Sequence, residues 1–380
     1  MLNQEILSYI EAHSQEAYEL LLTLARIPAP SNHEEKRAEF CRDWLAAQGA
    51  RGVYVDEALN VVYPVEAEGL VEVYMAHTDV VFPDTRELPL TVENGRICCP
   101  GVGDDTACLV CLLMAAKYIA AHVGKPEWDA LRGQGKPGLV LVCNAGEEGL
   151  GNLKGVRKIC ETYGTRMESF CTFDSSLDKI VNQAVGSKRF KVTVSTRGGH
   201  SFSDFGQDNA IAKLAGIVVR LYEIQVPEGP RTTYNVGLIS GGTSVNTIAQ
   251  QAEVLYEVRS ESRESLEFME GRFTSIIEQA RAEGLDVSVE VIGVRPCGGD
   301  VDPDKEKALT DRAMEVVRQA TGSMPRRGSG STDCNIPLSL GIPSVCVGCY
   351  RGEGAHTRSE YVEIDSLKQG YQVAFGMILG

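Results

Sequence analysis

The feature that most constrains the fold is a largely apolar run, Val71 to Ala76, that ends in His77-Thr-Asp79. A β-branched, apolar run of this length is typical of a buried strand, and the change to polar residues marks the edge of a sheet. Successive side chains of a strand alternate between its faces, so His77 and Asp79 point to the same side if the strand continues that far. A single His-x-Asp pair also fits a histidine that is tied into a turn.

The same arrangement recurs along the chain. Strands are predicted at 138–143, 168–174 and 342–347, and polar residues stand at or beyond the end of each. Together with a glycine-rich turn after Cys99, these segments supply Asp104, Asp105, Glu147, Glu148, Asp174 and His356. Strand, acidic turn and helix alternate, which predicts an α/β fold, with a mostly parallel sheet between two layers of helices. Ligand sites in such sheets lie at the carboxyl ends of the strands, where these residues fall.

Further elements follow from hydrophobic periodicity and from turn residues. We expect short strands at 52–55, 60–65 and 70–76, helices at 3–25, 34–48, 106–122 and 304–320 and from about 364, and a surface loop at 123–137. From about residue 186 the order changes to β-α-β-β-α-β, which makes a small antiparallel, ferredoxin-like α+β sheet with helices on one face. We therefore predict one domain formed by residues 1–185 and 296–380, with a smaller domain, residues 186–295, inserted into it.

The charge and the apolar runs exclude some classes of partner. A formal net charge of −15 argues against nucleic acid, which would require a basic face. No apolar run approaches the roughly 20 residues that span a bilayer, so we expect no membrane partner. The first ten residues are polar and acidic, unlike a secretory signal. The expected location is therefore the cytoplasm.

The chain contains twelve cysteines, many of them inside apolar runs. We interpret them as buried, reduced thiols of a cytosolic protein. The pairs Cys108/Cys111 and Cys346/Cys349 could in principle form a four-thiolate zinc site, and either Cys108 or Cys346 could serve a thiol-dependent enzyme. Cys108 and Cys111 lie on a predicted helix that is apolar nearly all round, which disfavours the zinc site.

The polar residues at the strand ends point to metal binding. Acids crowded at the ends of buried strands repel each other, and desolvation increases the cost, whereas a divalent cation removes both penalties. Imidazole and carboxylate ligands suit zinc, and also manganese or cobalt. Two histidines with several acids exceed the needs of one tetrahedral ion, so we expect two ions roughly 3.5–4 Å apart, bridged by a carboxylate and a water. The alternative is a set of solvated turns that never converge.

These motifs resemble those of the dizinc exopeptidases and deacylases, a family that includes peptidase T, carboxypeptidase G, aminoacylase and succinyl-diaminopimelate desuccinylase. The matching segments are His77-Thr-Asp79, Gly103-Asp104-Asp105, Gly146-Glu147-Glu148-Gly149, Asp174 and Ala355-His356. The resemblance spans nearly the whole chain, including the inserted domain, and the ordered set of motifs is highly specific.

The resemblance implies a role for each of these residues. Asp104 would bridge the two ions, His77 and Asp174 would hold one ion, and Glu148 and His356 would hold the other. Asp79 would orient His77. Glu147 would act as the general base, which takes a proton from the water and returns one to the leaving amine.

The inserted domain carries further matches to the family. His200, in Arg197-Gly-Gly-His-Ser, would help to polarise the scissile carbonyl, from the partner subunit in dimeric members. Asn246 would contact the substrate, and Arg259 would bind its carboxylate through a planar fork of hydrogen bonds. The alternatives are a histidine that satisfies a loop, for His200, and a surface ion pair, for Arg259.

Three segments bear on specificity. Thr106-Ala107 stands where the family usually has a lysine or methionine followed by glycine, and Phe202-Ser-Asp-Phe205 replaces a Gly-x-Pro-like turn. Ser331-Thr-Asp-Cys-Asn335 resembles a turn of the peptidase members and would line the substrate cleft. Its alternative is a polar turn that caps a helix. The first two segments depart from the family, leave the metal ligands intact and concern substrate specificity.

The sequence therefore predicts a metallo-exopeptidase with two divalent ions, most simply zinc. It would act on a small peptide as a di- or tripeptide aminopeptidase, with an inserted lid and dimerisation domain that moves about a hinge and a homodimeric assembly. An N-acyl amino-acid deacylase or carboxypeptidase with the same metal chemistry is the alternative activity, and an acylated amino acid is then the substrate. A non-catalytic peptide-binding relative is the alternative from another class.

Overall fold

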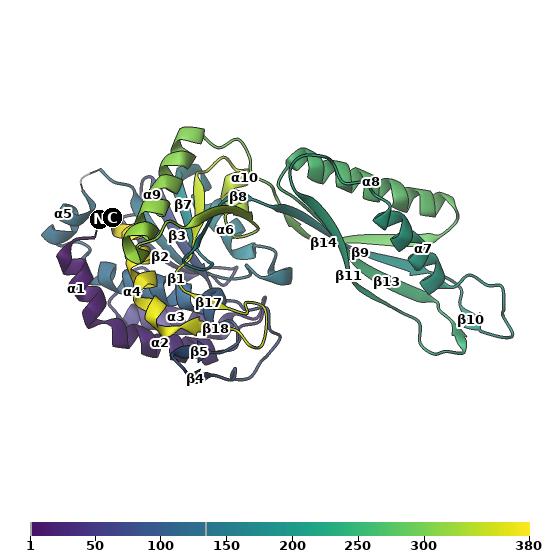
Figure 1. Cartoon of the computed structure of the whole chain (residues 1–380), viewed down its shortest axis with the longest axis horizontal. Coiled ribbons are helices and arrows are strands. Elements are labelled where there is room, and N and C mark those ends of the chain that lie inside the picture. The colour runs from purple at the N-terminus through teal and green to yellow at the C-terminus, as the bar shows by residue number, and fades with distance from the viewer. Residues whose placement is uncertain (1, 134) are drawn as a thin grey trace. The chain divides into compact units, whose positions relative to one another are not determined.

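The computed structural model describes residues 2–133 and 135–380. The chain forms two compact units: Met1–Ala184 with Gly299–Gly380, and Val185–Gly298 (Figure 1). Each unit has its own sheet and its own helices, and the second unit is an insertion between two parts of the first.

The first unit is built on an eight-stranded sheet. In spatial order its strands are β1 (Tyr54–Val55), β2 (Val61–Val65), β6 (Gly138–Asn144), β3 (Val71–His77), β7 (Met167–Phe173), β16 (Ser344–Val347), β8 (Lys179–Ala184) and β15 (Arg326–Gly330). The four neighbours β6, β3, β7 and β16 are parallel to one another, whereas β1, β2 and the β16–β8 pair are antiparallel. The predicted mostly parallel sheet is thus found at the centre of a mixed one.

Helices cover both faces of this sheet. They are α1 (Gln4–Ala12), α2 (Ser14–Arg26), α3 (Glu35–Ala47), α4 (Cys108–His122), α5 (Pro126–Arg132), α6 (Lys154–Tyr163), α9 (Pro303–Thr321), α10 (Asn335–Ser339) and α11 (Leu367–Leu379). Apolar residues of α1–α5, α9 and α11 pack with one face of the sheet, and those of α6 and α10 pack with the other. Successive strand residues pack on opposite faces of the sheet, as Tyr74 and Met75 do, and each face has its own apolar core. The three-layer α/β prediction is therefore confirmed.

A small antiparallel sheet, absent from the prediction, completes this unit. Its strands are β17 (Gly352–Glu353), β18 (Tyr361–Glu363), β5 (Arg96–Cys98) and β4 (Thr91–Glu93), in this spatial order. Strands of two or three residues leave almost no period-2 pattern in a sequence. The pairing of β18 with β5 brings the segment after β16 beside the segment before α4.

The second unit has the predicted ferredoxin-like order. Its elements are β9 (Gly186–Ser195), β10 (Gly199–His200), α7 (Ala210–Tyr222), β11 (Thr232–Gly241), β12 (Thr247–Ile248), β13 (Gln251–Ser260), α8 (Arg263–Ala282) and β14 (Asp286–Arg295). The four long strands form an antiparallel sheet in the order β11-β13-β9-β14, and β10 pairs with β12. Apolar residues of α7 and α8 pack against one face of the larger sheet, where Phe190 and Phe273 stack.

Two local predictions were wrong. The helix expected over 3–25 is interrupted at His13, whose ring stacks on Tyr9 and whose Nδ1 lies 2.9 Å from the Tyr9 carbonyl oxygen. The loop expected over 123–137 contains α5. Pro126 begins this helix and Trp128 is fully buried, so packing stabilises a short helix that periodicity alone could not reveal.

The expectation about apolar runs also needs correction. Within the described residues, the helical stretch Val102–His122 is long and apolar enough to cross a membrane by length and composition. Its most apolar part is 78% buried inside the protein, because α4 lies between β3 and α11 in the core. The stretch is therefore the central helix of the first unit.

Gly370 provides a test of this core. An added Cβ would lie 1.8 Å from the carbonyl oxygen of Cys349, so α11 could not keep its place in Gly370→Ala. We expect this substitution to lower the free energy of unfolding by about 1–3 kcal/mol or more, measured by chemical denaturation. Gly216→Ala in α7, where nothing lies within 4 Å, is the control and should be neutral or stabilising. Equal stability of Gly370→Ala and the unmodified protein would contradict this packing.

Candidate metal centre

The site begins at the carboxyl ends of three parallel strands. His77 is the last residue of β3, Asp174 follows β7, and Glu147 and Glu148 follow β6. Because β6, β3 and β7 are adjacent and parallel, these ends meet at one edge of the sheet. Three of the polar strand ends seen in the sequence are thus brought together by the topology itself.

The glycine-rich turn supplies the next carboxylates. Gly101 has a φ of +75°, and the wide helical turn Val102–Ala107 follows it before α4. Asp104 and Asp105 are joined by a cis peptide bond within this turn. Asp105 is buried and accepts a hydrogen bond of 2.8 Å from the backbone N–H of His77, which ties the turn to the end of β3.

Asp104 lies between the two histidines. Its Oδ1 is 3.1 Å from Nε2 of His77, and its Oδ2 is 3.1 Å from Nε2 of His356. The same His356 nitrogen lies 3.0 Å from Oε1 of Glu148. Each oxygen of one carboxylate therefore faces a different imidazole, as a bridging ligand requires.

Within the described residues, three groups have ligand atoms that all lie within 4.8 Å of one another. They are His77 with Asp104 and Asp174; Asp104 with Glu148 and His356; and His77 with Glu147 and Glu148. The first two groups share Asp104 and consist of the residues that the family resemblance assigns to the two ions. The alternative of turns that never converge is excluded for these residues, and none of the three groups includes a cysteine.

Asp79 connects the β3 end to the β6 end. Its carboxylate accepts hydrogen bonds from the backbone N–H groups of Glu147 (3.0 Å) and Glu148 (2.9 Å) and from the hydroxyl of Ser31 (2.7 Å). Nδ1 of His77 lies 3.0 Å from the Asp79 carbonyl oxygen and 3.4 Å from its carboxylate. With two acceptors beside it, Nδ1 carries a ring proton, and Nε2 is the nitrogen that faces Asp104.

Arg37 is a buried cation behind the site that sequence reasoning missed. It donates hydrogen bonds to the carbonyl oxygens of Thr78 (2.9 Å) and Ile27 (2.9 Å) and to the hydroxyl of Thr106 (3.2 Å). Burial lowers the pKa of Arg37 to about 10, although nearby acids oppose the shift. A lone arginine in an amphipathic helix reads as a surface residue, so no sequence signal marked it.

The crowding of carboxylates perturbs their titration. Burial raises the pKa of Asp174 well above its usual range, and the charge of Asp104 adds to the effect. Burial likewise raises the pKa of Glu148 to about 7. Hydrogen bonds to Asp104 and Glu148 raise the pKa of His356 to about 11. The negative charges of neighbouring carboxylates act in the same direction on all three groups, in addition to these larger causes. The donor set of imidazoles and carboxylates fits divalent zinc, cobalt or manganese.

His200 and Asn246 lie in the second unit. Nδ1 of His200 accepts from the backbone N–H groups of Phe202 (3.2 Å) and Ser203 (3.4 Å), so its proton lies on Nε2, which can donate to an oxygen. Ser201 donates through its N–H to the Asn246 carbonyl oxygen (3.0 Å). Both residues are exposed.

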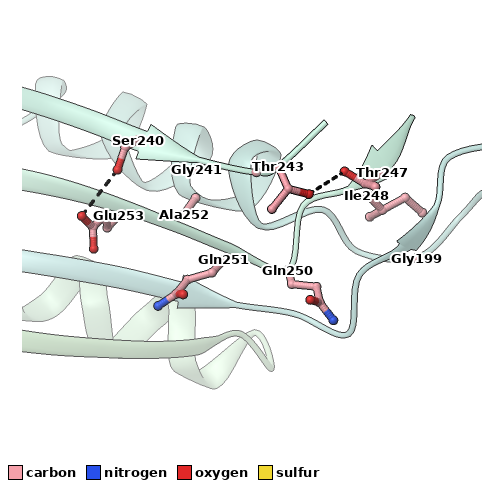
Figure 2. A pocket seen from close by; sticks show the side chains of 11 residues that line it. Gly199, Ser240, Gly241, Thr243, Thr247, Ile248, Gln250, Gln251, Ala252 and Glu253 are labelled. Atoms are coloured by element: carbon pink, nitrogen blue, oxygen red, sulfur yellow. Dashed lines mark hydrogen bonds between the residues drawn. The ribbon is translucent and has the colours of Figure 1, made fainter. Parts of the chain in front are cut away.

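A cavity of about 600 Å³ lies beside these two residues in the same unit. Figure 2 shows its lining, which includes Gly199 and Thr247, the direct neighbours of His200 and Asn246; Thr247 lies beside Thr243, and Gly199 pairs with Ile248. The hydroxyls of Thr243 and Thr247 are 3.2 Å apart. The loops that carry His200 and Asn246 therefore border a recess with both polar and apolar lining residues.

Arg259 belongs to a charged cluster on the sheet of the second unit. Its Nε lies 2.9 Å from Glu257, which also accepts from Nε of Arg189 at 3.2 Å. The ion pair considered as an alternative for Arg259 is therefore present. The Arg259 side chain is 39% exposed.

The turn after β15 is polar and is held by side-chain hydrogen bonds to its own backbone, whereas the N-cap residue of α10, Cys334, makes no side-chain cap bond. Thr332 donates its backbone N–H to Oδ1 of Asn335 (2.9 Å), and Cys334 donates to the hydroxyl of Thr332 (3.2 Å). Asp333 is fully buried and accepts a hydrogen bond of 2.7 Å from Asn144, just after which the Glu147 turn begins. Through this hydrogen bond the turn contacts Asn144, the last residue of β6.

Glu360 was also missed. This buried carboxylate accepts three backbone hydrogen bonds from the Asp104 turn. A glutamate in a polar loop is the expected composition of a solvated surface, so its position four residues after His356 was the only available signal.

A parallel sheet edge that gathers histidines and acids around a shared Asp104 defines the class: an α/β protein with a candidate dinuclear metal centre. Over residues 73–380 the chain matches the sequence profile of peptidase family M20/M25/M40, and it belongs to that family.

Individual relatives have diverse activities. An acetylornithine deacetylase of Myxococcus xanthus is 26% identical over 316 residues, 77% of this chain and 75% of that protein. A tripeptidase of Staphylococcus aureus has the same fold, with a TM-score of 0.74, 22% identity and coverage of 96% of this chain and 97% of that one. YxeP of Bacillus subtilis, described as a dinuclear metal-binding peptidase, has a TM-score of 0.63, 16% identity and coverage of 97% and 98%.

Asp333 makes the stability of the metal-free protein depend on pH. Burial and the charge of Glu147 raise its pKa to about 8, from an ordinary value of 3.8. As the pH rises, the unfolded chain releases this proton before the folded protein does. The contribution of Asp333 to the free energy of unfolding is therefore fully present below pH 3.8 and is lost as the pH rises through about 8. Asp333→Asn keeps an acceptor for Asn144 and should be more stable than the unmodified protein at pH 8, by up to a few kcal/mol, with little difference at pH 4. A difference in the free energy of unfolding between Asp333→Asn and the unmodified protein that is the same at all pH values would contradict this.

Proposed function

We propose that this protein is a metal-dependent exopeptidase that cleaves the terminal amide bond of a small peptide, as a di- or tripeptide aminopeptidase. The observation that carries the proposal is the position of Asp104, whose two oxygens face His77 and His356 separately. Family membership supports hydrolysis as the reaction. The tripeptidase neighbour favours a peptide as the substrate.

Two divalent cations, most simply zinc, fit the two ligand groups. His77 and Asp174 would hold one ion, Glu148 and His356 the other, and Asp104 would contribute to both. When bound, the ions supply Lewis acidity for the scissile carbonyl and lower the pKa of water. The dinuclear metal binding described for YxeP supports two ions in preference to one.

Glu147 is the proposed general base. Asp79 accepts hydrogen bonds from the backbone N–H groups of both Glu147 and Glu148, which fixes this turn. The two neighbouring side chains can therefore have different roles. Glu148 faces His356, and Glu147, which lies beside His77 and Glu148, would take a proton from the attacking water and return it to the leaving amine. Asp79 acts by orienting His77 and this turn.

The second unit would contribute substrate contacts. His200 presents an Nε2 proton that can polarise the scissile carbonyl, Asn246 can contact the substrate, and Arg259 can bind its carboxylate. Within the described residues, β11 is an outer strand of the four-stranded sheet and pairs with β13 on one side. This free edge supports a homodimer, and the unit would then serve as lid and dimer contact. The buried free thiols suit a reducing cytoplasm.

Glu147→Gln is the decisive test. Loss of the base should lower kcat by about 10²–10⁴-fold, while metal content per chain, measured by atomic emission, stays at the unmodified level. A variant that keeps full activity would remove Glu147 from the mechanism. A peptide-binding relative without activity would show no turnover in the unmodified protein either.

Two controls complete this test. Glu161→Gln changes an exposed glutamate of α6 in the same way and should leave kcat and metal content unchanged. Chelation of the unmodified protein should abolish hydrolysis, and addition of zinc, cobalt or manganese should restore it. Unchanged kcat in Cys108→Ala and in Cys346→Ala would exclude these two buried thiols as nucleophiles.

A deacylase or carboxypeptidase acting on N-acyl amino acids is the second candidate, favoured by the acetylornithine deacetylase relative. Both reactions pass through a tetrahedral intermediate, so the same metal groups serve either. A ninhydrin assay over free-amino dipeptides, tripeptides and N-acyl amino acids separates them. Release from free-amino peptides supports the aminopeptidase, and release from blocked amino acids alone overturns it in favour of the deacylase.

A further inference from the structure

We propose that Glu360 is a positioning residue that holds Asp104 between the two metal positions. This inference rests on the proposed function, because it concerns the placement of the proposed bridging ligand. The carboxylate of Glu360 faces the backbone of the turn that carries Asp104.

The contacts of Glu360 are unusually concentrated. Its Oε2 accepts a hydrogen bond from the backbone N–H of Gly101 (2.6 Å), and its Oε1 accepts from Gly103 (2.9 Å) and Asp104 (2.8 Å). Glu360 is 1% exposed. One buried carboxylate therefore satisfies three N–H groups of a single turn, including the N–H of Asp104 itself.

The shape of the turn makes this acceptor necessary. Asp104 (φ −100°, ψ 92°) and Asp105 (φ −123°, ψ 17°) depart from helical geometry, so an α-helical hydrogen-bond ladder does not run through them. Buried N–H groups outside such a ladder need another acceptor. A charged carboxylate is the strongest one that a side chain offers.

Gly103 permits the close approach. A Cβ at this position would lie 3.0 Å from Oε1 of Glu360 and 2.6 Å from a ring carbon of Tyr350. The turn is thus enclosed by Glu360 on one side and Tyr350 on another, which leaves Asp104 little freedom to move.

Glu360 also joins the turn to the segment that carries His356. His356 lies four residues earlier, and the hydrogen bonds Thr357 N–H to Gly354 (2.9 Å) and Glu360 N–H to Thr357 (3.4 Å) close the loop between them. The carbonyl oxygen of Glu360 accepts from the N–H of Cys99 (3.2 Å), just before the turn. Backbone and side chain of Glu360 therefore both fix the turn against this segment, and with it the 3.1 Å approach of Asp104 to His356.

A purely structural role for Glu360 would change stability alone. A positioning role also changes how the ions are held, because a displaced Asp104 alters the ligand field at both metal positions. The absorption spectrum of the cobalt-substituted protein responds to ligand geometry, and it separates these two accounts.

The experiment is a Co²⁺ titration of the metal-free full-length protein, followed by visible absorption and by calorimetry. We expect the unmodified protein to bind two ions. Glu360→Ala should bind at least one of them about 10–100-fold more weakly, as loss of a residue that orients a ligand typically does, with an altered spectrum. Glu360→Gln keeps an oxygen for Gly103 and Asp104 but places an NH₂ against the N–H of Gly101, so it should restore part of the affinity.

Asp302→Ala is the matched control. Asp302 accepts from the N–H groups of Asp304 (3.0 Å) and Lys305 (3.2 Å) at the start of α9, so its loss removes backbone hydrogen bonds of the same unit without touching the site. Its thermal stability should fall, while its Co²⁺ affinity and spectrum stay unchanged.

The outcomes are separable. An unmodified protein that fails to bind a pair of ions overturns the proposed function. Two ions in the unmodified protein, with unchanged affinity and spectrum in Glu360→Ala, overturn the positioning role alone. If Glu360→Ala does not fold, Glu360→Gln decides: a weaker affinity with a shifted spectrum supports the role, and values equal to those of the unmodified protein overturn it.

Discussion

The parallel alignment of β6, β3, β7 and β16 is the constraint on which the site depends. In a parallel sheet every carboxyl end falls at one edge, so residues that are far apart in the sequence are placed at the same edge. His77, Glu148 and Asp174 reach this edge from three of these strands. An antiparallel order of the same strands would send alternate ends to opposite edges and divide the group.

The convergence of these carboxylates has an electrostatic cost. Buried carboxylates beside one another are destabilising, and the raised pKa of Asp174 and of Glu148 expresses that cost. Arg37 lies behind the site and offsets part of the negative charge, and the imidazoles of His77 and His356 approach Asp104 from the front. Cations at the two ligand groups would relieve what remains, so binding of metal and stability of the folded chain are expected to be linked.

The sequence revealed the site residues that share one recurring pattern, a predicted strand followed by a polar residue. His77, Glu148 and Asp174 could be found because each ends a run with a clear strand pattern, and the convergence of strand ends is a rule of the α/β fold. Their roles came from a family resemblance rather than from spacing. Arg37 and Glu360 could not be found, because both support the site through backbone groups of turns whose geometry no local pattern encodes.

The same distinction explains the errors in the fold. The break at His13 and the helix around Trp128 depend on which neighbours each ring packs against, and tertiary packing overrides propensity at such positions. The short strands β17 and β18 escaped detection for a related reason, since their pairing with β5 requires long-range closure. Elements with a clear pattern, such as α9 and β6, were predicted nearly to the residue.

The insertion of the second unit has a consequence for how the protein is made. His77, Asp104, Glu148 and Asp174 are all synthesised before Val185, whereas β16, His356 and Glu360 follow Gly298. During translation the ribosome must therefore complete the entire inserted unit before the central sheet can receive its last parallel strand. A nascent chain would display a half-assembled acidic site for that whole interval, and its maturation with metal could finish only after His356 leaves the exit tunnel.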